Sequence, residues 1–314
     1  MREGIVSKMR IRWLWLLWRV LFAILMLWFI GDILWVVLSF HPPRFAITKN
    51  PSDFGLQHEG AEFTTEDGVR IAGWFIPASK TNDTRCTVVV CHGYPGARSR
   101  FIDVLPALHR GGFSVFMFDF RGNGESGGKP TIGRMEVKDV EGAVKWLRKN
   151  KPKACFGIGI IGFSMGGAVA IMAAAQNKEL KAVISDSAYA SLDRPAKLTL
   201  KRTFGPLAPV LGIPAWVTFR IMLGCNPEDI APYRVIGRIS PRAVFIIHGT
   251  ADHKVSVEDA LLLYRSAKQP KELWIGEGVK HVRMFAVYQS EYEKRMVAFF
   301  KRYLLQKDTW IGGR

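Results

Sequence analysis

Residues 162–166 read Gly162-Phe163-Ser164-Met165-Gly166, a serine with a glycine two positions away on each side. An apolar strand-like run, 156–161, precedes this stretch, and an Ala-rich run typical of a helix, 167–176, follows it. Glycines permit a sharp turn directly from strand to helix, because they have no Cβ atom to clash. A serine on such a turn is held out toward solvent. The stretch therefore predicts a nucleophilic serine at a strand–helix junction.

The chain on both sides of this turn alternates between strand-like and helix-like patterns. A hairpin is predicted over 62–78, with its turn at Asp67-Gly68. Further strands are expected at 87–92, 114–120, 156–163, 182–185, 243–248 and 272–275, and helices at 98–110, 135–150, 167–176, 257–267 and 288–305. An antiparallel start followed by repeated β–α units predicts a mostly parallel, eight-stranded α/β sheet with helices on both faces.

The segment 189–239 breaks this alternation, with six prolines and short apolar runs but no β–α unit. A structureless loop of this length is improbable in a compact domain. We therefore expect a helical cap insertion at about 189–240, over the carboxyl edge of the sheet. Its apolar and basic content suits an acyl-binding lid or a membrane-facing surface. A folded spacer that only shields the site is the alternative.

The first 44 residues differ from the rest. Val20–Phe40 is a run of 21 residues with one charge, long enough to cross a bilayer core of about 30 Å. Basic residues lie on its N-terminal side, among them Lys8, Arg10, Arg12 and Arg19. The positive-inside rule then places the N-terminus in the cytoplasm and the domain 45–314 across the membrane. A cleaved signal peptide and a buried core helix are the alternatives, but the run is too long for the first and lacks a polar face for the second.

Asp32 lies inside this predicted anchor (1–44), where a carboxyl group is costly. Three explanations are open. The carboxyl group is protonated, it faces a partner helix, or it marks a shallower, hairpin-like insertion that turns at Gly31-Asp32.

A serine hydroxyl needs a histidine to accept its proton and a carboxylate to orient that histidine. In a parallel α/β sheet, such groups follow the carboxyl ends of strands. Asp252 follows the strand at 243–248, and His281 follows the strand at 272–275. Asp186, after the strand at 182–185, is the alternative acid. The chain order of Ser164, Asp252 and His281 favours Asp252.

An oxyanion hole needs two backbone N–H donors. The amide of Met165, at the start of the following helix, and the amide of Tyr94, after the strand at 87–92, are the candidates. His92 is expected to shape the loop that holds Tyr94. His109, His248 and His253 fit the role of base less well, since His248, for example, lies within a strand.

Five motifs occur in one order: HGYPG (92–96), DFRGNGESGG (119–128), GFSMGG (162–167), HGTAD (248–252) and GVKH (278–281). Together they resemble the alpha/beta-hydrolase superfamily, most of all its membrane-anchored serine hydrolases and its dienelactone-hydrolase and dipeptidyl-peptidase-like branches. The resemblance covers roughly residues 60–305. It implies the triad Ser164, Asp252 and His281, with Tyr94 and Met165 as oxyanion donors. The HGGG loop of hormone-sensitive-lipase-type esterases is absent.

Residues 45–314 contain 38 basic and 25 acidic residues, a net charge of +13. Anionic headgroups suit such a surface beside a bilayer better than nucleic acid does. The resulting hypothesis is a serine hydrolase that cleaves lipid or acyl esters at a membrane surface. A serine peptidase or thioesterase and a non-catalytic scaffold are the alternatives. The sequence indicates no metal, no organic cofactor and no oligomeric state, and the four cysteines are expected to be buried free thiols.

Overall fold

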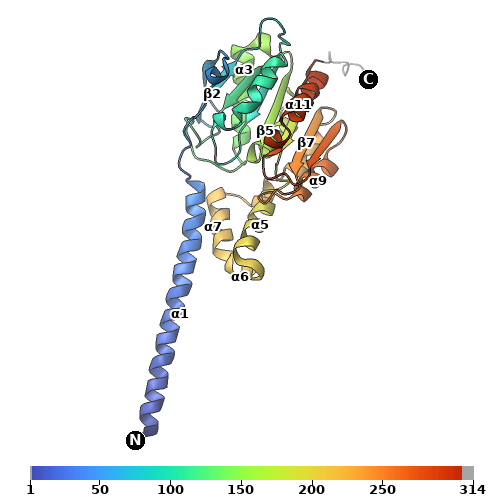
Figure 1. Ribbon diagram of the computed structural model, residues 1–314. Helices are drawn as coiled ribbons and strands as arrows, with labels where there is room; N and C mark the ends of the chain where they lie inside the picture. Colours follow the sequence, from blue (N-terminus) through green and yellow to red (C-terminus); the bar gives the residue numbers. More distant parts are fainter. Residues whose placement is uncertain (1, 306–314) are drawn as a thin grey trace. The chain divides into compact units, whose positions relative to one another are not determined.

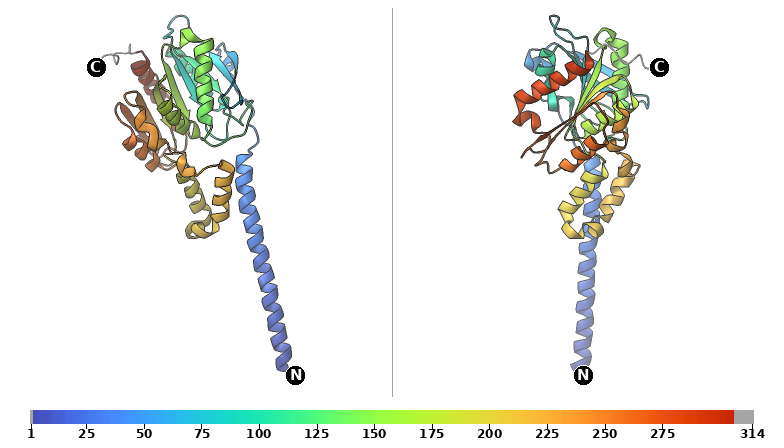
Figure 2. Two further views of the ribbon diagram at one scale, coloured as in Figure 1. Left: turned by 180° about the vertical axis from the view of Figure 1, so that it is seen from behind. Right: turned by 90° about the vertical axis from the view of Figure 1, so that its right-hand side faces the viewer.

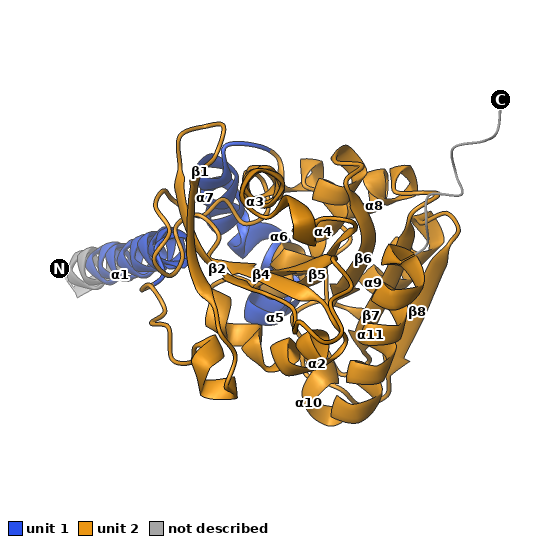
Figure 3. Ribbon diagram, turned by 90° about the horizontal axis from the view of Figure 1, so that it is seen from above, with its two compact units in different colours: residues 1–42, 200–225 blue, residues 43–199, 226–314 orange. Residues whose placement is uncertain are grey.

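The computed structural model describes residues 2–305, and the chain divides into two compact units. The smaller unit comprises residues 1–42 and 200–225, and the larger unit comprises residues 43–199 and 226–314 (Figure 3).

The larger unit is built on one eight-stranded sheet with the order β1-β2-β4-β3-β5-β6-β7-β8 (Figure 1). Its strands are β1 (Glu59–Thr64), β2 (Arg70–Ile76), β3 (Thr87–Cys91), β4 (Ser114–Phe118), β5 (Ile158–Phe163), β6 (Leu180–Asp186), β7 (Ala243–Gly249) and β8 (Lys271–Gly276). Strand β2 is antiparallel to both β1 and β4, and all other neighbours are parallel. The predicted sheet, with its antiparallel start, is confirmed.

Helices cover both faces of this sheet, as Figure 3 shows from above. On one face α2 (Leu105–Arg110) packs against α11 (Gln289–Leu304). On the other face α3 (Glu136–Asn150), α4 (Met165–Gln176), α8 (Pro232–Val235) and α9 (Val257–Ser266) follow one another in contact. A short helix, α10 (Met284–Val287), precedes α11. The remaining short helices of this unit are 3-10 helices: Pro51–Phe54, Arg98–Val104, Pro152–Ala154, Pro227–Asp229 and Ile236–Arg238.

The helix expected over 98–110 differs in its first half, which is the 3-10 helix Arg98–Val104. The α-helix starts only at Leu105, which places Pro106 in its first turn. Proline has no N–H to donate and is tolerated in the first turn but not in a helix interior. The position of Pro106 therefore accounts for the late start of α2.

Strands β3, β4, β5 and β7 are buried along their whole length, as expected of strands covered on both faces. The α11 side of the core is closed by five buried side chains at helical spacing: Tyr292, Met296, Phe299, Phe300 and Leu304. These five side chains form the apolar stripe of α11 that faces the core, and the charged residues of the helix lie on its outer surface.

The parallel strands end at a common edge. Phe163 of β5 pairs with Asp186 of β6, and Asp186 pairs with Ile247 of β7. Gly249 of β7 in turn pairs with Gly276 of β8. The loops that follow these four strands therefore leave the sheet side by side.

The smaller unit consists of helices. It holds α1 (Arg2–Phe40), the end of α5 (Asp193–Phe204), a 3-10 turn (Gly205–Leu207), α6 (Ala208–Leu211) and α7 (Ile213–Leu223). The segment predicted as an insertion is thus helical. Among the described residues, Ile11–Phe40 is a helix long and apolar enough to cross a membrane, and its most apolar stretch of 18 residues has a mean hydropathy of 2.5.

Helix α1 runs without a break through Gly31 and Asp32, so the chain does not turn there. Asp32 is buried, and its Oδ2 accepts a hydrogen bond from the amide of Ala215 in α7, at 3.0 Å. Of the three explanations for Asp32, the structure thus supports a partner helix.

The turn at Ser164 depends on close backbone packing that leaves no room for a Cβ atom. A Cβ atom on Gly162 would lie 2.1 Å from the carbonyl oxygen of Gly166. A Cβ atom on Gly166 would lie 2.4 Å from the carbonyl oxygen of Cys91 in β3. Since the obstacles are backbone atoms, they cannot rotate away as a side chain would.

We predict that Gly166→Ala lowers the thermal unfolding midpoint by about 3 to 10 °C, since overpacking of this kind costs about 1–3 kcal/mol. Gly60→Ala in β1 is the matched control, because nothing lies within 4 Å of its added Cβ. Circular dichroism of the full chain measures both midpoints. Equal midpoints for the two variants would contradict the packing argument.

Candidate active site

Ser164 lies on the turn between β5 and α4, with φ 54° and ψ −120°. This conformation is rare for a residue with a side chain and stores strain. Its neighbours Phe163 and Met165 are buried, whereas Ser164 is partly exposed. The amide of Ser164 donates to the carbonyl oxygen of Asp186 at 2.8 Å, which ties the turn to β6. The serine is therefore presented outward from a fixed backbone.

The structure brings Ser164, His281 and Asp252 together in one hydrogen-bonded chain. The distance from Ser164 Oγ to His281 Nε2 is 2.9 Å. The distance from His281 Nδ1 to Asp252 Oδ2 is 2.6 Å. The three residues come from three separate loops at the carboxyl edge of the sheet.

The Asp252 carboxylate has a hydrogen-bond donor at both oxygens. Its Oδ1 accepts from the amides of Lys254 (2.8 Å) and Val255 (3.0 Å), while Oδ2 faces His281 and His248. Burial alone would raise the pKa of Asp252, but the hydrogen bonds from His248 and His281 hold it well below its usual range. An ionised Asp252 fixes the proton of His281 on Nδ1, which leaves Nε2 to accept the hydroxyl proton of Ser164.

His248 is a second imidazole on the same carboxylate, which the sequence analysis did not anticipate. Its Nε2 lies 3.3 Å from Asp252 Oδ2 and 3.1 Å from the carbonyl oxygen of Val255. Burial lowers the pKa of His248, but the hydrogen bonds to Asp252 and Val255 outweigh it, and the net shift is upward. The sequence feature that could have predicted this contact is the spacing of four positions from His248 to Asp252, which lets the loop fold back onto the end of β7.

Asp186, the alternative acid, is buried and bonded elsewhere. It accepts from Ser187 Oγ at 2.8 Å and from the hydroxyl of Tyr292 at 2.9 Å, and burial raises its pKa. His281 Nδ1 is hydrogen-bonded to Asp252 instead. Ser187 Oγ also accepts from the amide of Val282, at 3.1 Å. Asp186 thus anchors the loop that carries His281.

Ser187 and Tyr292 were missed by the sequence analysis. Tyr292 is separated from Asp186 by 106 positions, so no local pattern joins them. Ser187 has a φ of 55°, a strained conformation for a residue with a side chain.

The loop after β3 lies directly against this turn. A Cβ atom on Gly93 would lie 3.2 Å from both Ser164 Cβ and the carbonyl oxygen of Phe163. Tyr94 is the next residue along this loop. Met165 is the first residue of α4, where the N–H groups have no intrahelical acceptor and the helix dipole favours negative charge. Both predicted oxyanion donors therefore lie on segments adjoining Ser164.

His92 is occupied by two hydrogen bonds within the loops. Its Nδ1 donates to the carbonyl oxygen of Gly93 at 2.7 Å, and its Nε2 accepts from the amide of Phe120 at 3.0 Å. Burial lowers the pKa of His92. These contacts are those of a residue that shapes the loop, as expected.

The motif 119–128 braces the same loop through a buried ion pair. Asp119 Oδ2 lies 2.8 Å from Arg98 Nη1, and Asp119 Oδ1 accepts from the Arg98 amide at 2.6 Å. Asn123 Oδ1 accepts from the amide of Gly96 at 3.2 Å. Since Arg98 and Gly96 follow β3 while Asp119 and Asn123 follow β4, the motif joins the two loops.

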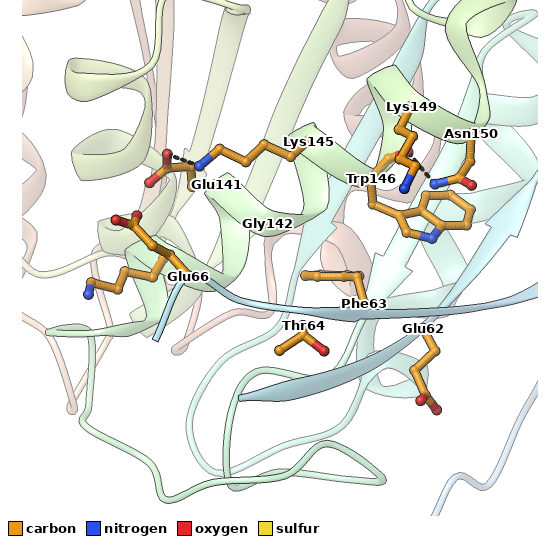
Figure 4. Close-up of a pocket in the computed structure, with 11 residues that line it drawn as sticks. Glu62, Phe63, Thr64, Glu66, Glu141, Gly142, Lys145, Trp146, Lys149 and Asn150 are labelled. Carbon is orange, nitrogen blue, oxygen red and sulfur yellow. Dashed lines mark hydrogen bonds and ion pairs between the residues drawn. The ribbon is translucent and has the colours of Figure 1, made fainter. Parts of the chain in front are cut away.

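A separate groove of about 500 Å³ lies between β1 and α3 (Figure 4). Phe63 and Trp146 form its apolar part, and an ion pair of Glu141 with Lys145, at 2.8 Å, lies at its rim. None of its lining residues belongs to the Ser164 group, so we assign it no part in the chemistry. Within residues 2–305, no three His, Cys, Asp or Glu side chains are grouped to hold a metal ion.

A family model described as the alpha/beta hydrolase fold matches residues 87–210. The protein YfhR of Escherichia coli O157:H7 is 30% identical over 246 residues, which cover 77% of this chain and 80% of that protein.

Two solved structures show the same fold. The Pyrococcus furiosus esterase Pf2001 is 32% identical with a TM-score of 0.72, and the match covers 85% of this chain and 98% of the esterase. The Pyrococcus horikoshii acylaminoacyl peptidase, at 19% identity and a TM-score of 0.63, is similar in fold alone; the match covers 84% of this chain and 45% of the peptidase. The chain therefore belongs to the alpha/beta hydrolase family.

Proposed function

We propose that this protein is a membrane-anchored serine hydrolase that cleaves carboxylic esters through a covalent intermediate on Ser164. The observation that carries the proposal is the continuous hydrogen-bonded chain from Ser164 Oγ through His281 to Asp252, at 2.9 and 2.6 Å. Nucleophile, base and orienting acid lie within the distances that acyl transfer requires.

The reaction follows from the proton positions. Ser164 Oγ attacks the ester carbonyl carbon while His281 Nε2 takes the hydroxyl proton. The tetrahedral oxyanion accepts hydrogen bonds from the amides of Tyr94 and Met165. Collapse breaks the C–O bond, and His281 returns the proton to the leaving alcohol oxygen. Water, activated by His281, then attacks the acyl-enzyme and releases the acid and free Ser164.

The same triad would cleave an amide or a thioester. An ester substrate is favoured because the Pyrococcus furiosus esterase is 32% identical in sequence to this chain. The acylaminoacyl peptidase, at 19% identity, shares the fold alone. A serine peptidase or thioesterase is the second candidate.

The membrane anchor is proposed on the length and character of α1. Ile11–Phe40 contains a stretch of 18 residues with a mean hydropathy of 2.5, and the side chains of this helix are largely exposed, Leu27 for example to 71%. The basic residues before it favour a cytoplasmic N-terminus, with the larger unit on the other side. Lipid or acyl esters are then the substrates within reach, and the basic larger unit suits anionic headgroups.

We expect Ser164→Ala to lower the rate of p-nitrophenyl ester hydrolysis by at least about 10⁴-fold and to abolish fluorophosphonate labelling. The change removes the nucleophile but no buried volume of consequence. Ser52→Ala, at an exposed serine, is the control and should keep both signals. Equal labelling of the Ser164→Ala variant and the natural protein would refute the serine mechanism.

A panel of substrates separates the bonds. p-Nitrophenyl esters of rising chain length should react with a higher kcat/KM than matched thioesters and p-nitroanilides of the same acyl groups. The thioester arm tests the thioesterase alternative, and the anilide arm tests the peptidase. A preference for either would replace the ester assignment while leaving Ser164 as the nucleophile.

Asp252→Asn should lower kcat by about 10³- to 10⁴-fold, because the neutral amide neither fixes the tautomer of His281 nor stabilises its charged form. Asp186→Asn should lower kcat by no more than about tenfold, since Asp186 acts only through Tyr292 and Ser187. Both rates are measured on protein whose circular dichroism matches the natural chain. A larger loss of kcat in Asp186→Asn than in Asp252→Asn would identify Asp186 as the acid.

A further inference from the structure

Asp32 takes no part in the proposed hydrolase reaction, and its environment is unusual for a carboxyl group. This carboxylate lies in the apolar helix α1, yet its side chain is only 6% exposed, because α7 covers it. Figures 1 and 2 show α7 beside the C-terminal part of α1, and both belong to the smaller unit.

The contact is a helix cap supplied from another helix. Helix α7 starts at Ile213, so the amide of Ala215 lies in its first turn and has no intrahelical acceptor. Pro214, before it, has no N–H to offer. Asp32 Oδ2 accepts from the Ala215 amide at 3.0 Å, at the end of α7 where the helix dipole is positive. Each element satisfies a polar group of the other.

The same face of α1 continues the contact. Asp32, Val36 and Phe40 are its buried residues in this part, spaced by four positions each. The ring centroids of Phe40 and Phe219 lie 5.6 Å apart. Eight residues of helix correspond to about 12 Å. Helix α7 therefore packs along roughly the last 12 Å of the proposed membrane span.

The outward surface of residues 200–225 of the smaller unit is apolar. Residues 203–219 contain no charged side chain, and Lys201, Arg202 and Arg220, all exposed, flank this run. Between residues 207 and 221, five large apolar side chains point outward: Leu207, Val210, Ile213, Val217 and Ile221. Val210 is 65% exposed and Ile221 is 72% exposed. The arrangement is that of a bilayer-inserted element, with an apolar tip and basic residues at headgroup depth.

The segment is too short to cross a bilayer. Its two arms, Asp193–Leu211 and Ile213–Leu223, are bent by 94° to each other and together are as apolar as a membrane span. The 11 residues of α7 measure about 16 Å, roughly half of a 30 Å hydrocarbon core. Residues 199 and 226 at its two ends both belong to the larger unit. The segment therefore enters and leaves from the same side.

We propose that residues 200–225 form a re-entrant helical hairpin inserted into one membrane leaflet, where Asp32 of α1 caps α7. The surrounding partner is lipid hydrocarbon at the tip and anionic headgroups at Lys201, Arg202 and Arg220. The proposal rests on the membrane span proposed for α1. It makes the anchor a two-element structure and gives Asp32 a positioning role.

Depth-dependent fluorescence quenching of the full chain tests this. Bimane is attached at single cysteines in a Cys225→Ser background, in proteoliposomes of phosphatidylcholine and phosphatidylglycerol; the other three cysteines are buried. The labelled variants are Val210→Cys at the tip, Leu27→Cys in α1 and Ser52→Cys in the larger unit. Val210 and Leu27 labels should be quenched by phospholipids brominated on the acyl chain, and the Ser52 label by iodide alone.

The three positions separate the two proposals. If the Leu27 label is not quenched by brominated lipid, the span of α1 is wrong, and the membrane anchor of the proposed function fails with it, while the hydrolase reaction is tested separately at Ser164. If the Leu27 label is quenched but the Val210 label responds to iodide like Ser52, only the hairpin is overturned. A Val210 label shielded from both quenchers shows that protein, such as a second copy of this chain, covers the tip, and this also overturns the hairpin.

Substitution of Asp32 tests the cap. Asp32→Leu removes the acceptor. The loss of a helix cap should shift the equilibrium between α7 packed on α1 and α7 detached from it by about fivefold. The iodide accessibility of the Val210 label should therefore rise in the Asp32→Leu variant. Asp32→Asn keeps an acceptor oxygen and should retain most of the natural protection. Equal protection in both variants, with the Leu27 label still in lipid, would show that Asp32 does not position α7.

Discussion

The packing of the Ser164 turn against the end of β3 is the constraint on which the larger unit depends. Gly162 and Gly166 approach each other and the carbonyl oxygen of Cys91 so closely that no side chain fits at either position. This approach holds Ser164 at positive φ and brings Gly93 into contact with its Cβ atom. Ser164, the start of α4 and the loop after β3 are thereby fixed by backbone atoms rather than by mobile side chains.

Asp252 and His281, the proposed acid and base, are held by a second layer of polar contacts. Asp252 receives donors from two histidines and two amides, so it remains ionised, and the orientation of His281 is set. Asp186, which a plain reading of strand ends made an alternative acid, instead joins β6 to α11 through Tyr292. Two carboxylates at one sheet edge thus differ in role because their hydrogen-bond partners differ.

The smaller unit solves a comparable problem with one polar contact. A carboxylate in an apolar helix and a helix start that lacks acceptors are each costly alone. The hydrogen bond between Asp32 and Ala215 satisfies both at once. Such a contact fixes which face of α1 meets α7, since apolar side chains alone give little directional preference.

The sequence by itself predicted the elements and the candidate reactive residues. Its strand and helix periods predicted the eight-stranded sheet, and the order of Ser164, Asp252 and His281 predicted residues that the fold indeed brings together, because these signals are local or depend only on chain order. It left out the contact of His248 with Asp252, which are four positions apart, and the contact partners of Tyr292 and Asp32. The last two join positions that only the folded chain brings together, such as Asp32 and Ala215, 183 positions apart. Tertiary structure alone decided them, because a hydrogen bond depends on distance in space and not on spacing in the sequence.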